Sequence, residues 1–332
     1  MINNKFSLGF FPTPLTELKN LSAKFPDYKI YIKRDDQTGL ATGGNKTRKL
    51  EYLIQQAIDS GCDTVITAGA QQSNHCRQTA AACAIAGLEC HLLLGGDQPK
   101  NYQGNLLLSS ILGAKIHFTG AHRKGEDTPI LTTQLEAKGK KCYVIPYGGS
   151  NLIGALGFVN AVNELKTQIL QNDITLDYIF FASSSGGMQA GLTLGQLIYD
   201  LPFELIPINI DKDETNGIAL EEVVLNIVNQ GLKTLQINKT ITLSDIKLNR
   251  NYDHDGYGNV TKNEVKAIKE LASSEGILLD PVYTGRAFYG MLDMLEKKKI
   301  PLRSNVMFWH TGGFPAIFKY GNEMMKNFDE IK

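Results

Sequence analysis

The chain has 332 residues, of which 34 are basic and 34 acidic, so its formal net charge is zero. It is 42% hydrophobic and 20% charged, which is typical of a globular protein with a sizeable core. No basic excess indicates binding to nucleic acid or to an anionic membrane, and no segment has the roughly 20 apolar residues of a membrane span.

Short apolar runs alternate with amphipathic segments between residues 29 and 210. In chain order we expect strand 29–36, helix 49–61, strand 63–70, helix 73–87, strand 90–96, helix 101–114, strand 115–120, helix 129–138, strand 142–149, helix 151–170, strand 178–183, helix 188–200 and strand 203–210. This alternation predicts βαβ units and parallel sheets. Several helices follow strands through turns of Gly, Ser and Asn, and open α/β sheets bind ligands at such turns.

One of the first such turns is the glycine-rich stretch "TGLATGGNKTRKLEY" at 38–52, which carries Lys46 among small residues. A nucleotide phosphate loop needs G-x-x-x-x-G-K-[ST]. Gly39 and Gly44 have the right spacing, but Asn45 displaces the lysine by one residue, which would misplace its amine against the phosphates. The stretch therefore argues against an NTPase.

Two other interpretations remain for the same stretch. In the first it is an ordinary turn into a helix, with Lys46, Arg48 and Lys49 on a solvated first turn. Basic residues are unfavourable there because the helix dipole is positive at its N-terminus, so three of them indicate a compensating anion. In the second the amine of Lys46 forms a Schiff base with a carbonyl cofactor such as pyridoxal phosphate (PLP).

Other turns offer the further parts that a PLP site needs. The segment "SSSGGMQAG" at 183–191 joins a strand to a helix, and its N–H groups and hydroxyls suit a phosphate, although an ordinary capped helix is the alternative. The segment "QQSNHCRQTAA" at 71–81 begins another helix, in which Ser73 is equally suited to be the N-cap. Later, "DPVYTGRA" and "FWHTGGFPAIF" each place polar residues at a turn.

Five motifs, "GGNKTRKLEY", "QSNHCRQTAA", "SSSGGMQAG", "DPVYTG" and "HTGG", occur in this order over nearly the whole chain. In them the chain closely resembles the 1-aminocyclopropane-1-carboxylate (ACC) deaminase and D-cysteine desulfhydrase family. The resemblance implies the tryptophan-synthase-like fold of PLP enzymes (fold type II): an α/β protein with two open, twisted, mainly parallel sheets flanked by helices. It also implies a large domain (1–47 plus 156–332), a small domain (48–155), the cofactor between them, and a homodimer.

The resemblance assigns residues to the cofactor and to catalysis. Those that would bind PLP are Lys46, Lys49, Asn74, Ser185, Gly186, Gly187, Met188, Thr284 and Thr311. Those that would act on the substrate are Lys46, Ser73, Tyr257 and Tyr283. Lys46 would carry the Schiff base and Asn74 would donate to the ring hydroxyl. The freed Lys46 amine, Ser73 or a tyrosine would take the α-proton.

Two positions separate the branches of the family. ACC deaminases have a glutamate and a leucine where this chain has Thr284 and Thr311, as D-cysteine desulfhydrases do. A carboxylate would keep the pyridine nitrogen protonated and the ring a strong electron sink, which opening a cyclopropane requires more than expelling sulfide does. We therefore expect β-elimination of D-cysteine to pyruvate, hydrogen sulfide and ammonia. The alternatives are ACC deaminase, cysteate sulfo-lyase, and a ligand-binding protein that kept the fold without the chemistry.

The cysteines and His310 complete the candidates. The five cysteines are an odd number without a CxxC pair, which favours a reducing, cytoplasmic setting over a disulfide framework. Cys76, Cys83 and Cys90 lack a zinc-type spacing, so we expect buried thiols and no metal. His310 either shapes the pocket or caps its loop. We expect the partner to be a small amino acid, with neither nucleic acid nor membrane.

Overall fold

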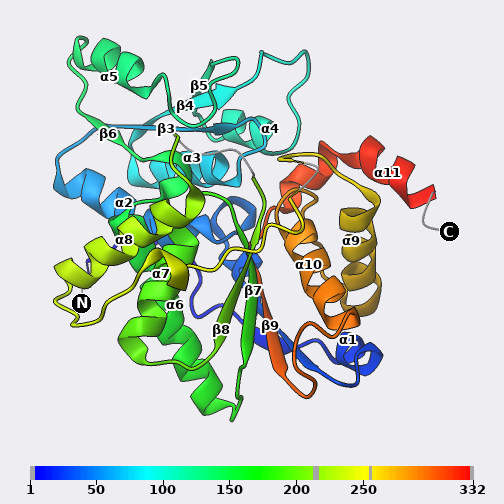
Figure 1. Cartoon of the computed structure of the whole chain (residues 1–332). Helices are drawn as coiled ribbons and strands as arrows, with labels where there is room; N and C mark the ends of the chain where they lie inside the picture. The colour runs from blue at the N-terminus through cyan, green and yellow to red at the C-terminus, as the bar shows by residue number, and fades with distance from the viewer. Residues whose placement is uncertain (1–3, 212–216, 254–255, 330–332) are drawn as a thin grey trace.

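The computed structural model describes residues 4–211, 217–253 and 256–329 (Figure 1). Its strands are β1 (Leu15–Glu17), β2 (Lys29–Arg34), β3 (Thr64–Ala70), β4 (Glu89–Gly95), β5 (Lys115–Phe118), β6 (Cys142–Val144), β7 (Tyr178–Ser183), β8 (Glu204–Asn209) and β9 (Asn305–His310). Its α-helices are α1 (Lys19–Lys24), α2 (Lys46–Asp59), α3 (Asn74–Ala86), α4 (Gly104–Ile111), α5 (Thr128–Glu136), α6 (Leu152–Gln171), α7 (Gly187–Tyr199), α8 (Leu220–Thr234), α9 (Lys262–Glu275), α10 (Thr284–Glu296) and α11 (Gly321–Asp329).

The strands form two sheets, as the predicted fold class requires. A five-stranded sheet has the order β1-β2-β9-β7-β8, and a four-stranded sheet has the order β5-β4-β3-β6. Only the edge pair β1–β2 is antiparallel in the described chain. The two sheets occupy the lower and upper parts of Figure 1, with helices on their faces.

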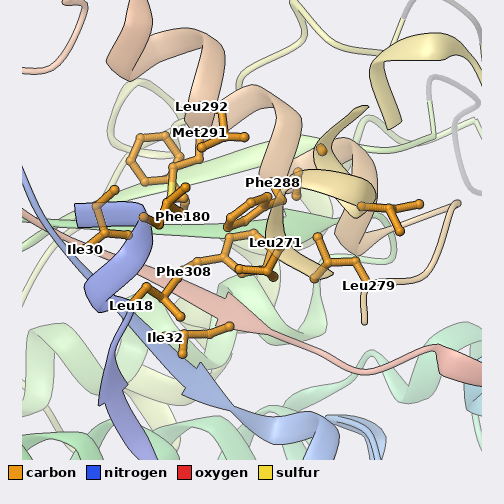
Figure 2. Packing of buried hydrophobic residues seen from close by; sticks show 14 of the residues in the cluster. Leu18, Ile30, Ile32, Phe180, Leu271, Leu279, Phe288, Met291, Leu292 and Phe308 are labelled. Carbon is orange, nitrogen blue, oxygen red and sulfur yellow. The ribbon is translucent and has the colours of Figure 1, made fainter. Parts of the chain in front are cut away.

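The five-stranded sheet is buried on both faces because its strands alternate apolar side chains between two cores. Phe180 and Phe308 pack with α1, α9 and α10 in one core, where the rings of Phe288 and Phe308 meet edge to face at 5.0 Å (Figure 2). Phe181 and Trp309 point to the opposite core, which is covered by α6 and α7. Neither face is available to solvent, so ligands can reach this sheet only at its ends.

The four-stranded sheet has its own core, in which α2, α3 and α4 contribute Leu50, Cys76 and Leu106. On its other face α5 packs through Leu131 and Leu135. All four strands lie within residues 64–144, inside the range expected for the small domain. The domain boundaries themselves stay a prediction.

Helix α6 packs unusually closely between α2 and α7. A Cβ atom added at Gly157 of α6 would lie 2.1 Å from the carbonyl oxygen of Arg48, and one added at Gly191 of α7 would lie 2.3 Å from that of Ala155. Real Cβ contacts never come this near, so these glycines let the helix backbones touch. This contact sets the positions of the N-termini of α2 and α7.

Most elements begin or end a few residues from the predicted boundaries, and two of these differences have a clear local cause. Helix α2 begins at Lys46, three residues before the predicted start at 49, because Gln78 of α3 accepts the backbone N–H of Thr47 at 2.8 Å and satisfies the first turn. Strand β6 ends at Val144 and not at 149, because Pro146 and two glycines with φ of +63° turn the chain into a 3₁₀ turn, η3 (Tyr147–Gly149). Across the described residues, every helix is too short or too polar to cross a membrane.

Candidate functional site

One pocket gathers most of the residues singled out from the sequence. It lies at the carboxyl ends of β3, β7 and β9, where the N-termini of α2, α3 and α7 converge. Its described lining residues are Asn45, Lys46, Ser73, Asn74, His75, Tyr147, Gly148, Ala182, Ser183, Ser184, Ser185, Gly186, Met188, Gln189, Tyr283 and Thr311. Among them there is no aspartate or glutamate.

Lys46, the first residue of α2, is partly open to this pocket. Burial lowers the pKa of its amine to about 8, while nearby Cys76 acts in the opposite direction. About a tenth of the amine is therefore neutral at pH 7, far more than for a lysine with the ordinary pKa, and the neutral amine is the nucleophilic form. The interpretation of a solvated basic first turn is wrong, since Arg48 is 4% exposed and Lys49 fully buried.

Lys49 and Ser150 stand beside the N-terminus of α7. The amine of Lys49 donates to the carbonyl oxygen of Gly148 at 2.9 Å and to Oγ of Ser150 at 3.2 Å, and Ser150 also accepts the N–H of Gly187 at 3.1 Å. Helix α7 begins after Gly186, which has a φ of +81°, and it has neither a side-chain cap nor an acid in its first turn. Burial, and then the charge of Lys46, lowers the pKa of the Lys49 amine well below its ordinary value, so an anion beside it would favour its charged form. The N–H groups of α7 beyond Gly187 and the Lys49 amine together form a cradle for such an anion.

Ser73 and Asn74 come from the turn between β3 and α3. Ser73 caps α3 by accepting the N–H of Cys76 at 3.2 Å, and it also lines the pocket, so both of its expected roles are compatible. The Oδ1 atom of Asn74 accepts from Arg77 at 3.2 Å and from Asn105 at 2.8 Å. Because arginine only donates, Oδ1 must face it, and the Nδ2 amide group is left to donate to a ligand in the pocket.

Two tyrosines, Tyr257 and Tyr283, are in contact at the pocket. The hydroxyls of Tyr257 and Tyr283 are 2.6 Å apart, and only Tyr283 lines the pocket. Burial raises the pKa of both phenols well above the ordinary value, so both hold their protons through neutral pH. Arg123, from the segment between β5 and α5, lies over the ring of Tyr257, with its guanidinium carbon 4.7 Å from the ring centroid.

The two threonines are placed differently. Thr311 lines the pocket, whereas Thr284 does not and is fully buried at the start of α10. The hydroxyl of Thr284 donates to Oδ1 of Asp280 at 2.7 Å. His310 also lies outside the pocket lining, and it holds its loop by donating to the carbonyl oxygen of Leu278 at 3.1 Å and accepting the N–H of Gly312 at 3.3 Å.

Several pocket residues escaped the sequence analysis, among them His75 and Tyr147. His75 is neutral, because burial and then the charges of Lys46 and Lys49 hold its pKa well below the ordinary value, and its Nδ1 atom has no partner among the described residues. Tyr147 follows β6 and precedes two glycines. The glycine pair that follows Tyr147, at the carboxyl end of an expected strand, could have indicated from the sequence that Tyr147 lies at the pocket.

Comparison with known proteins gives a consistent result. A family described as "Pyridoxal-phosphate dependent enzyme" matches residues 6–312. A D-cysteine desulfhydrase of Klebsiella pneumoniae (strain 342) is 41% identical over 319 residues, which cover 93% of this chain and 94% of that protein. A putative 1-aminocyclopropane-1-carboxylate deaminase of Pyrococcus abyssi is 39% identical, with 95% of this chain and 93% of that protein covered. The crystal structure of an ACC deaminase homologue superposes with a TM-score of 0.89 at 36% identity, covering 98% of this chain and 96% of the other.

Proposed function

The chain belongs to the pyridoxal-phosphate-dependent enzyme family, and on that premise we propose that it releases hydrogen sulfide from D-cysteine. It is a PLP-dependent lyase of the D-cysteine desulfhydrase and ACC deaminase group. The proposed reaction consumes D-cysteine and one water, and it yields pyruvate, ammonia and hydrogen sulfide.

The residues of the pocket fit PLP at each end of the cofactor. The N-terminus of α7 suits the phosphate, with Ser185 in the pocket lining, and with Gly187 and the buried amine of Lys49 beside the lining, where both bond to Ser150. The free amide group of Asn74 suits the ring hydroxyl, and the partly neutral amine of Lys46 suits the aldehyde carbon. We propose these residues as the cofactor site, with Gly186 and Met188 completing the phosphate loop and Thr311 nearest to the ring nitrogen.

The observation that carries the choice of D-cysteine is the lack of a carboxylate among the described residues of the pocket. Bound PLP supplies an electron sink for the pair of electrons left at the α-carbon. A hydroxyl such as that of Thr311 leaves the ring nitrogen neutral and the sink weak. Expulsion of sulfide from the β-carbon needs less help than opening a cyclopropane ring, so the pocket favours elimination.

The chain's own groups then have distinct tasks. The neutral amine of Lys46 takes the proton from the α-carbon, and Ser73 orients the substrate from the N-terminus of α3. Tyr283 gives its proton to the departing sulfur, because its raised pKa keeps it protonated. Tyr257 holds the Tyr283 hydroxyl from behind at 2.6 Å.

The first test compares D-cysteine, L-cysteine, D-cysteate and ACC as substrates of the PLP-loaded protein. We expect sulfide and pyruvate in equal amounts from D-cysteine, and little product from the others. Faster release of sulfite from D-cysteate than of sulfide from D-cysteine would identify a sulfo-lyase. Ammonia and 2-oxobutyrate from ACC would refute the argument from Thr284 and Thr311, and inactivity with bound PLP on all four would favour a ligand-binding protein.

Replacing Tyr283 by phenylalanine tests the proposed acid. We expect kcat for D-cysteine to fall by about 10²- to 10⁴-fold, the usual contribution of a general acid, while PLP stays bound. The matched control is Tyr289→Phe, on the same helix, since Tyr289 packs against Tyr252 outside the pocket lining. Steady-state kinetics and cofactor absorbance measure both effects, and an unchanged kcat in Tyr283→Phe would remove this residue from the mechanism.

A further inference from the structure

Arg77 on α3 is a fully buried cation whose hydrogen bonds all reach neutral oxygen atoms. It donates to Oδ1 of Asn105 at 2.6 Å, to Oδ1 of Asn74 at 3.2 Å and to the carbonyl oxygen of Gly43 at 2.6 Å. Its Nε atom has no partner among the described residues. Other buried arginines of this chain are ion-paired: Arg48 contacts Asp35 at 2.7 Å, and Arg286 contacts Glu264 at 2.8 Å.

An unpaired buried cation is costly, because the protein must replace the water that would solvate it. Burial lowers the pKa of Arg77 to about 9, with Asp280 acting in the opposite direction. Asp280 is itself occupied, since its carboxylate accepts the N–H groups of Val282, Tyr283 and Thr284 at the start of α10. The charge of Arg77 is therefore only partly balanced by the chain.

Arg77 connects two parts of the pocket that the sequence keeps apart. Through Nη2 it holds Gly43, three residues before Lys46, in a backbone conformation with a φ of +74°. Through Nη1 it fixes the amide of Asn74 and so directs Nδ2 away from itself. A single guanidinium thus orients both the loop that carries the amine and the amide that faces the ligand.

We propose that Arg77 is a positioning residue that acts through Asn74 to keep the ring oxygen of PLP in its anionic form. The positive charge behind Oδ1 polarises the amide, which strengthens Nδ2 as a donor to an anion. The inference rests on the proposed placement of PLP, with Asn74 at the ring hydroxyl. The anionic ring oxygen would in turn compensate the part of the Arg77 charge that the chain leaves unbalanced.

Other ionisable groups face the same pocket and must be held constant in a test. Lys46 comes from α2 and the neutral His75 comes from α3. Lys49, also on α2, lies beside the lining, and burial lowers its pKa well below the ordinary value. Tyr147 and Tyr283 stand on the other side and remain protonated, because burial raises the pKa of Tyr147 to about 12 and that of Tyr283 well above the ordinary value. Replacing Arg77 leaves all of them in place, so a change in the ring oxygen's ionisation reports on Arg77.

The test uses the purified full chain and PLP, with the variants Arg77→Gln and Arg77→Lys. The dissociation constant for PLP and the pH dependence of the bound cofactor's absorbance are measured without substrate. We expect Arg77→Gln to bind PLP about ten- to hundredfold more weakly, the loss typical of a charge-assisted hydrogen bond. The absorbance midpoint should move to higher pH, because loss of the cation favours the protonated ring oxygen.

Arg77→Lys keeps the charge without the planar fork, so we expect weaker binding with a midpoint close to that of the wild type. Thr79→Val is the control on the same helix, since among the described residues the Thr79 hydroxyl bonds only to the carbonyl oxygen of His75, at 2.9 Å. If Arg77→Gln does not fold, the dissociation constant of Arg77→Lys for PLP tests the proposal in its place. Affinity and midpoint equal to those of the wild type in the folded variants would overturn the proposal. If the wild type binds PLP but does not act on D-cysteine, only the assignment of D-cysteine as the substrate is refuted, and the proposal for Arg77 stands.

Discussion

The Lys46→Ala variant should lose sulfide release from D-cysteine by more than about 10⁴-fold, the upper range for loss of a single acid–base group, since it removes the covalent attachment as well. PLP should still bind, because the cradle of Lys49, Ser150 and the N-terminus of α7 remains. Borohydride reduction followed by mass spectrometry of peptides should find PLP on Lys46 in the wild type and on no peptide of the variant.

The pKa of Lys46 adds a second expectation for the same experiment. Because this pKa is lowered to about 8, the neutral amine increases with pH through that value. The rate of covalent PLP capture by cofactor-free wild type should rise accordingly, and Lys46→Ala should show no such rise. Lys138→Ala, at an exposed lysine, serves as the control. Turnover by Lys46→Ala comparable to the wild type would refute the assignment of the amine.

The second large effect is on stability and comes from Asp35. This fully buried carboxylate accepts from Nε of Arg48 at 2.7 Å, from Nη2 of Arg48 at 2.8 Å and from the hydroxyl of Thr13 at 2.8 Å. Asp35→Ala leaves Arg48 with a buried charge for which, within the described part of the chain, Glu164 at 3.0 Å is the remaining ion-pair partner. We expect the free energy of unfolding to fall by about 3–5 kcal/mol, the usual effect of breaking a buried pair. Urea denaturation at fixed PLP concentration measures it.

Asp36→Asn is the neighbouring control, because Asp36 forms a partly exposed pair with Arg34 and should cost less than about 1 kcal/mol. Burial alone would raise the pKa of Asp35, but Arg48 outweighs it and the pKa lies below the ordinary value of 3.8. This contribution to stability is therefore complete above pH 3.8 and is lost as pH falls through the folded pKa. Equal unfolding free energies for Asp35→Ala and Asp36→Asn would contradict the prediction.

The sequence was sufficient for the features that depend on local pattern. The alternation of strands and helices predicted parallel sheets with ligand-binding turns at the ends of their strands. The family resemblance implied that there are two sheets and that Lys46, Asn74 and Ser185 share one site, and these three residues line one pocket. Their roles toward PLP stay predictions. The start of α2 was missed because its first turn is completed by Gln78, a contact between segments 31 residues apart.

Other features depend on tertiary contacts that no window of sequence contains. Arg77 resembles any polar residue of a helix in the sequence, and only the packing shows that residues 74–83 of this helix are all buried. Thr284 and Thr311 both lie in polar turn motifs. The hydroxyl of Thr284 is bonded to the nearby Asp280, whereas Thr311 lines the pocket. Tyr147 was overlooked because the expected strand was carried on to residue 149, through the turn that places it.

The glycine contacts between α6 and its neighbours have a consequence for how the enzyme can change. Arg48, whose carbonyl oxygen contacts Gly157, is two residues from Lys46, and Gly191 lies one turn after the anion cradle at the N-terminus of α7. The distance between the Lys46 amine and the cradle is therefore set outside the pocket, by contacts between residues that do not line it. A methyl group added at Gly157 or Gly191 would push these helices apart and so change the distance between Lys46 and the cradle, although it would touch no residue of the pocket lining.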